Sequence, residues 1–124
     1  MLMFKRNIKG VIFDFDGTLV LSNAIKTEAF IEVAKPFKNG AAEMKNLISK
    51  SDGDRYEVLR EFCNLMNLGD DYPTLTQKYN NLTEKKIVSA KQVCGAEEAL
   101  YTIKYDLNLV CCLNTATPIT EIEK

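Results

Sequence analysis

The chain has 124 residues, 46% of them hydrophobic and 27% charged, and these values fit one globular domain. Sixteen Lys and Arg residues against seventeen Asp and Glu residues give a net charge of −1, which argues against nucleic acid or a membrane surface as the main partner. There is no histidine, so Ser-His-Asp triads and histidine-based metal sites are excluded.

The cysteines and the N-terminal segment bear on where the protein works. The four cysteines show no CxxC spacing, which favours reduced thiols in a cytosolic protein. Residues 1–10 contain no apolar region long enough for a signal peptide. No stretch approaches the roughly 20 apolar residues of a membrane span. We therefore expect a soluble, cytoplasmic protein.

The first predicted element is a strand that starts the segment 11–18. This segment begins as a β-branched and aromatic run and ends in turn residues, so we expect a strand buried on both faces, as in a parallel sheet. Asp14 and Asp16 come at its C-terminal end. Ligands bind at that end of the strands in open α/β sheets.

Four amphipathic helices are predicted next. The first is capped by Ser22 or Asn23, and the second follows Gly40. The third follows the turn and cap signal at residues 51–53, and the fourth covers about 74–88. A short helix opening near residue 95, an apolar run and a final helix then complete the chain.

That apolar run, residues 107–113, is interpreted as a second buried strand, and Pro118 predicts the start of the final helix. The order of elements predicts an α/β fold with a partial Rossmann-like parallel sheet core and an inserted helical cap. The core would comprise residues 1–21 and 91–124, and the cap residues 22–90. Because two strands do not make a stable parallel sheet alone, this core is incomplete.

The spacing Asp14-x-Asp16-Gly17-Thr18 after a strand is the strongest chemical signal. One carboxylate can attack a phosphoryl group while the other transfers a proton. A cation such as Mg²⁺, which accepts carboxylate and backbone oxygens, would offset the repulsion between the anions. Gly17 lets the backbone turn closely around a phosphate, and the amides that follow, including that of Thr18, can donate to it.

The alternative interpretation is a plain turn at the end of a strand, since Asp-Gly is common in turns. Asp14 argues against it. A carboxylate inside this apolar run would be costly to bury without a partner. We also expect little positive charge near the two aspartates.

The segment 11–20 closely resembles the first motif of the haloacid dehalogenase-like hydrolases. The resemblance implies that Asp14 is the nucleophile, which forms an aspartyl-phosphate, and that Asp16 acts as general acid and then as base. It also implies Mg²⁺ as cofactor, bound by the Asp14 carboxylate, the Asp16 backbone carbonyl and a later acidic motif. The helical insertion is similar to the cap of phosphoglycolate phosphatases and β-phosphoglucomutases, which implies a phosphatase, or else a mutase, for a small phosphorylated metabolite.

Residues 113–118 resemble the second motif of this family. Thr115 would then supply a phosphate-binding hydroxyl and Ala116 an amide of the following turn. The alternative for Thr115 is a helix N-cap, and both readings can hold together. Arg55 lies where such caps carry a substrate-facing loop and could clamp an anionic substrate. The alternative for Arg55 is a solvated arginine at a helix start.

The sequence departs from the family pattern in two places. Leu21 stands where many members with this cap have Asp, and Lys124 has no recognisable third-motif context. We therefore expect a truncated form of a longer enzyme that lacks its C-terminal half. The rival interpretation is an inactive relic or a binding or assembly module of the same fold. A third is that self-association or a second polypeptide completes the sheet.

Overall fold

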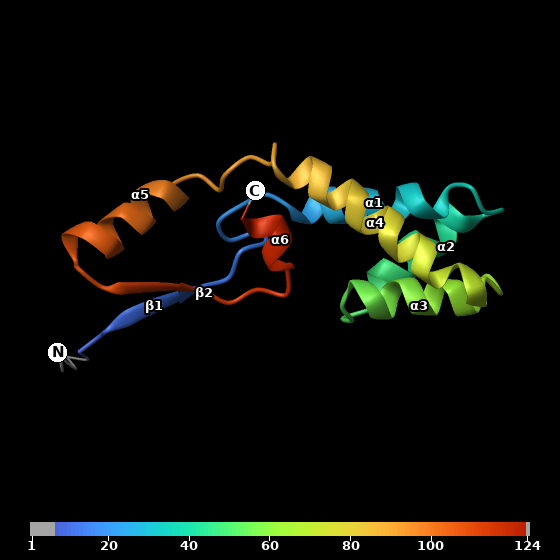
Figure 1. The fold of residues 1–124 in the computed structure, drawn as a ribbon, viewed down its shortest axis with the longest axis horizontal. Coiled ribbons are helices and arrows are strands. Elements are labelled where there is room, and N and C mark those ends of the chain that lie inside the picture. Colours follow the sequence, from blue (N-terminus) through green and yellow to red (C-terminus); the bar gives the residue numbers. More distant parts are fainter. Residues whose placement is uncertain (1–6, 124) are drawn as a thin grey trace.

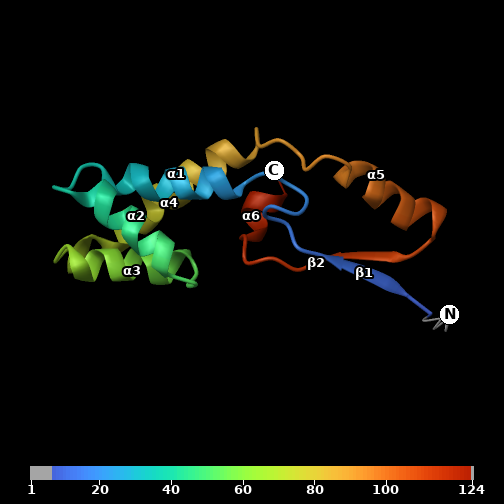
Figure 2. The same ribbon diagram turned by 180° about the vertical axis from the view of Figure 1, so that it is seen from behind.

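The computed structural model describes residues 7–123. Figure 1 shows an elongated arrangement, with the sheet and α5 at one end, the helices α1 to α4 at the other, and α6 between them; Figure 2 shows the same order from behind. The strands are β1 (Gly10–Phe13) and β2 (Val110–Leu113). The α-helices are α1 (Asn23–Ala34), α2 (Gly40–Lys50), α3 (Arg55–Leu65), α4 (Tyr72–Ile87), α5 (Ala96–Tyr101) and α6 (Ile119–Ile122), with a 3-10 turn η1 (Gly69–Asp71) and a π-helical segment η2 (Thr102–Asp106).

The sheet has the predicted parallel pairing. Gly10 lies opposite Val110, and the register continues to Phe13 and Leu113. β2 begins later than residue 107 because Asn108 adopts a left-handed conformation, with φ of 50°, which interrupts an extended backbone. The mixed α/β fold with a small parallel sheet is therefore confirmed.

The expectation that both strands are buried on both faces is wrong. Ile12 is 71% exposed and Val110 is 63% exposed. The physical reason is that the sheet of the described residues contains only these two strands. One face of β1 is half-buried, at Val11 and Phe13, and the face that carries Ile12 is exposed. A continuous apolar run indicates side chains that favour burial, but their burial also requires other elements to pack against them.

The hydrophobic core lies in the helical bundle α1–α4. Aromatic rings pack within this core: the centroids of Phe30 and Tyr79 are 4.3 Å apart, and those of Phe37 and Phe62 are 5.9 Å apart. The fully buried side chains at its centre include Val33, Met44, Leu59 and Phe62. No helix in residues 7–123 combines the length and the apolar character that crossing a bilayer requires.

The segments that enter and leave the bundle run side by side. The Leu21 amide donates to the Lys91 carbonyl at 2.8 Å, and the Val93 amide donates to the Leu19 carbonyl at 2.9 Å. The two segments that connect the bundle to the sheet region are therefore hydrogen-bonded to each other.

The division into a core of residues 1–21 and 91–124 and a cap of residues 22–90 stays a prediction.

Candidate active site

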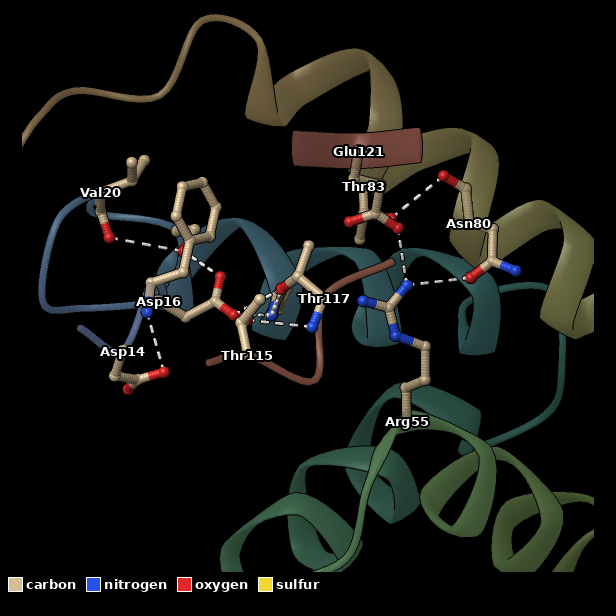
Figure 3. A network of polar contacts seen from close by, with 12 residues as sticks. Asp14, Asp16, Val20, Arg55, Asn80, Thr83, Thr115, Thr117 and Glu121 are labelled. Atoms are coloured by element: carbon tan, nitrogen blue, oxygen red, sulfur yellow. Dashed lines mark hydrogen bonds and ion pairs between the residues drawn. The ribbon is translucent and has the colours of Figure 1, made fainter. Parts of the chain in front are cut away.

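The parallel pairing brings the two predicted motifs to one edge of the sheet. Asp14 follows β1 directly, and the loop after β2 begins beside it, with the Asn114 amide donating to the Phe13 carbonyl at 2.8 Å. Figure 3 shows Asp14, Asp16, Thr115 and Thr117 around this edge. The geometry follows from the pairing, because parallel strands end on the same side of a sheet.

Asp14 presents an exposed carboxylate. Its Oδ1 accepts a hydrogen bond from the Phe15 amide at 2.8 Å. The argument that Asp14 would be costly to bury therefore does not apply, because the strand end is open to solvent. An exposed, weakly engaged carboxylate is available to attack an electrophile or to bind a cation.

Asp16, in contrast, is surrounded by donors. Its carboxylate accepts hydrogen bonds from the Ser22 hydroxyl, the Lys26 ammonium and the Thr117 hydroxyl, the last at 2.6 Å. Lys26 Nζ also donates to Thr117 Oγ1 at 3.0 Å, which closes a small network. The Asp16 side chain is only 15% exposed. The network fixes the position of this carboxylate.

These contacts set the charge of Asp16. Burial acts to raise the pKa of Asp16, but the hydrogen bonds from Lys26, Ser22 and Thr117, with the charge of Lys26, together hold the pKa below its usual value. Asp16 is therefore ionised at neutral pH. An ionised carboxylate can accept a proton, and it must first gain one before it can act as an acid.

Lys26 corrects the expectation of little positive charge near the aspartates. It is four residues after Ser22 and four before Phe30, so the three side chains share one face of α1. Ser22 occupies the predicted N-cap position but makes no capping bond, because its hydroxyl goes to Asp16. A lysine on the same face as buried Phe30 was a usable sequence signal.

The backbone amides of the turn after Asp16 donate hydrogen bonds within the turn itself. Gly17 has φ of 74°, a left-handed conformation that favours glycine. The Gly17 amide donates to the Val20 carbonyl at 2.7 Å, and the Thr18 amide donates to the Phe15 carbonyl at 3.2 Å. The phosphate contacts predicted for Gly17 and Thr18 stay a prediction. Because both amides already donate within the turn, the turn would have to open before they could donate to a phosphate.

Thr115 caps the turn that precedes α6. Its Oγ1 accepts a hydrogen bond from the Thr117 amide at 3.1 Å within that turn. The interpretation of Thr115 as a helix N-cap is wrong, because the N-cap of α6 is Pro118, three residues later. A hydroxyl that accepts a bond keeps its own proton, so Thr115 can still donate to a phosphate oxygen. The phosphate roles of Thr115 and Ala116 stay predictions. Thr117, which sequence reasoning missed, is the threonine that reaches Asp16.

Arg55 is buried, so the interpretation as a solvated arginine is wrong. Arg55 Nη1 donates to Glu121 Oε1 at 2.8 Å and to Asn80 Oδ1 at 3.1 Å (Figure 3). The two charged side chains are 7% and 3% exposed. The guanidinium also lies over the Tyr79 ring, 5.4 Å from its centroid. The substrate role predicted for Arg55 stays untested, but its charge is already paired.

The fit of a magnesium ion rests on Asp14. Within residues 7–123, no group of three or more acidic, cysteine or histidine side chains could hold a metal. Mg²⁺ usually keeps several waters and takes one or two protein carboxylates together with phosphate oxygens. The open Asp14 carboxylate fits such a site. The Asp16 carboxylate is occupied by Lys26 and its neighbours, and the Asp16 backbone carbonyl, the ligand that the resemblance implies, stays a prediction.

Fold and site together define an α/β protein with an aspartate-centred site at the end of a parallel strand and a helical insertion after it. Residues 11–115 match the family model described as haloacid dehalogenase-like hydrolase, and the chain belongs to this family. No curated protein gave a match.

A solved structure agrees with this assignment. The chain is similar to a crystal structure described as a HAD hydrolase, family IA, variant 3, from Entamoeba histolytica HM-1:IMSS. The TM-score is 0.71 at 19% sequence identity, and this likeness shows the fold. The match covers 94% of this chain and 52% of that one, so the chain spans about half the length of the solved structure.

Proposed function

We propose that the chain supplies the nucleophile and the proton-transfer residue of a magnesium-dependent phosphohydrolase, which acts on a small phosphorylated metabolite through an aspartyl-phosphate. The observation that carries the proposal is the contrast between the two aspartates. Asp14 is open and weakly engaged, whereas Asp16, beside it, is held by Ser22, Lys26 and Thr117. Membership of the hydrolase family supports the reaction class.

In the first step, an Asp14 carboxylate oxygen attacks phosphorus and the bond from phosphorus to the leaving oxygen breaks. The leaving oxygen takes a proton from Asp16. In the second step, water attacks the phosphorus of the aspartyl-phosphate, Asp16 takes the proton from that water, and phosphate and free Asp14 are regenerated. Thr115 follows β2 at the same edge of the sheet as Asp14, and its hydroxyl would donate to a phosphate oxygen there.

The two steps need Asp16 in different protonation states. The hydrogen bonds from Lys26 and Thr117 favour the ionised form that the second step needs. The first step needs the protonated form. We propose that the substrate phosphate, as a second anion near Lys26, competes for the ammonium group and so raises the pKa of Asp16 when substrate binds.

Magnesium would be held by the Asp14 carboxylate together with phosphate oxygens and water, and it would reduce the repulsion between the attacking carboxylate and the phosphate. With one open protein carboxylate, we expect the ion to bind weakly in the absence of phosphate.

The cytoplasmic location also stays a proposal, supported by the four unpaired cysteines Cys63, Cys94, Cys111 and Cys112.

The test is hydrolysis of a generic aryl phosphate with and without Mg²⁺. Asp14→Asn removes the nucleophile, and Asp106→Asn makes the same chemical change at an exposed position in η2. We expect activity that needs Mg²⁺, is lost in Asp14→Asn and persists in Asp106→Asn. Equal activity in the two variants would contradict the proposal.

A second candidate function is an assembly or binding module of the same fold. The observation that favours it is the exposed apolar sheet, where Ile12 and Val110 lie uncovered. A self-associating chain or a partner polypeptide would bury these side chains. Sedimentation at increasing protein concentration tests this candidate: a monomer throughout would count against self-association.

A further inference from the structure

A cavity of about 240 Å³ lies between the helical bundle and the loop after β2. It reaches the site at Lys26, which pairs with Asp16, and at Ala116, which lies between the two threonines of the site. On the bundle side it is lined by Arg55 and Tyr79, among others. In the proposed mechanism the leaving oxygen takes its proton from Asp16, and Lys26, the partner of Asp16, lines the cavity, so the leaving group would extend toward it.

Both cations that line the cavity are already neutralised. Lys26 is paired with Asp16, and Arg55 is paired with Glu121 in a buried ion pair 2.8 Å long. In the proposed mechanism the Lys26 ammonium is shared between Asp16 and the substrate phosphate, so it is not left for a charged leaving group. An anion bound at Arg55 would add an uncompensated negative charge beside the buried Glu121 carboxylate.

The remaining charged group of the lining is an acid. The Asp54 carboxylate accepts hydrogen bonds from the Tyr56 amide at 2.8 Å and the Glu57 amide at 3.0 Å, as the cap of α3. Each of the two ion pairs has no net charge. The Asp54 carboxylate therefore gives the lining, counted together with the partners of its cations, a net negative charge. An anionic leaving group would therefore be repelled as well as unpaired.

The rest of the lining is largely aromatic. Tyr56 offers the accessible ring, 42% exposed, whereas the buried rings of Phe30 and Tyr79, which pack against each other at 4.3 Å, form the floor of the cavity. Aromatic walls favour a flat, apolar surface on the ligand. We infer that the substrate is a phosphate monoester whose leaving group is uncharged and has an apolar or aromatic face. This inference rests on the proposed function and replaces the expectation that Arg55 clamps an anion.

The first test is binding of two leaving groups that differ only in charge. 4-Hydroxybenzamide is neutral and 4-hydroxybenzoate is anionic, and they have nearly the same shape. We expect the NMR signals of the Tyr56 and Tyr79 rings to shift with 4-hydroxybenzamide at concentrations about tenfold lower than with 4-hydroxybenzoate. Equal or tighter binding of the benzoate, or no shift of these rings with either compound, would overturn the inference.

The phosphate esters of the same two phenols separate this inference from the proposed function. Turnover of neither ester would overturn the proposed function, and the binding comparison would still decide the inference. Faster turnover of the carboxylated ester, compared at kcat/KM, would overturn the inference and leave the phosphohydrolase standing.

A variant tests the charge argument directly. Glu121→Gln leaves Arg55 without its carboxylate partner, so the preference for the neutral phenol should shrink or reverse. A folded Glu121→Gln protein with an unchanged preference would overturn the argument that ion pairing sets the specificity. If this variant does not fold, the comparison in the unmodified chain decides.

Discussion

The charge of Asp16 is set by residues of two other segments, the start of α1 and the loop after β2. Thr117 donates to Asp16 across 101 residues of chain, and Lys26 reaches it from α1. The aspartate pair and Gly17 could be read from the sequence, because a strand followed by a tight turn is a local pattern. The helix face of Lys26 could also be read from the sequence, but its contact with Asp16, like that of Thr117, depends on how α1 and the loop after β2 pack against the turn.

The first prediction concerns Lys26. Lys26→Met removes the ammonium that lowers the pKa of Asp16, so the Asp16 carboxyl should titrate at higher pH than in the unmodified chain. The ¹³C NMR signal of the carboxyl carbon, followed against pH, measures this directly. Lys35→Met is the matched control, because Lys35 is an exposed lysine at the end of the same helix, paired with Glu32. An unchanged Asp16 titration in Lys26→Met would contradict this account of the network.

At the scale of single elements, helix starts were the most predictable features. Asp54 accepts bonds from the Tyr56 and Glu57 amides, and Glu57 reaches back to the Asp54 amide, which is a complete capping box. Such caps depend on neighbouring residues alone, so the turn signal at residues 51–53 placed α3 correctly. Strand burial was predicted wrongly because it depends on neighbouring layers, as the exposed Ile12 shows.

The capping box gives the second prediction. Asp54→Ala should lower the free energy of unfolding by about 1 kcal/mol, because two amides at the start of α3 lose their acceptor. Urea denaturation followed by circular dichroism measures this. Asp52→Ala is the control, since Asp52 is an exposed aspartate two residues earlier. A loss as large in Asp52→Ala would show that the cap is not the cause.

At the scale of the whole molecule, one buried ion pair ties the bundle to the C-terminal helix. Arg55 at the start of α3 meets Glu121 in α6, and Asn80 and Thr83 of α4 surround the pair (Figure 3). The order of strands and helices predicted an α/β fold with a helical insertion. It did not predict this contact, because Arg55 and Glu121 lie 66 residues apart.

The third prediction concerns this pair. Glu121→Ala leaves the Arg55 charge buried without its partner, so the free energy of unfolding should fall by about 3 kcal/mol or more. Glu123→Ala removes an exposed carboxylate two residues later and should change little. Denaturant titration compares the two variants. Similar losses in both would mean that the ion pair does not hold α6 against the bundle.

Covalent trapping at Asp14 tests the central claim most directly. The chain is incubated with an aryl phosphate and Mg²⁺ and then treated with borohydride, which reduces an aspartyl-phosphate to an alcohol, and the peptides are mapped by mass spectrometry. The account predicts reduction at Asp14 and at no other carboxylate, with none in Asp14→Asn. Turnover without modification of Asp14, or modification of a different carboxylate, would contradict the assignment of Asp14 as the nucleophile.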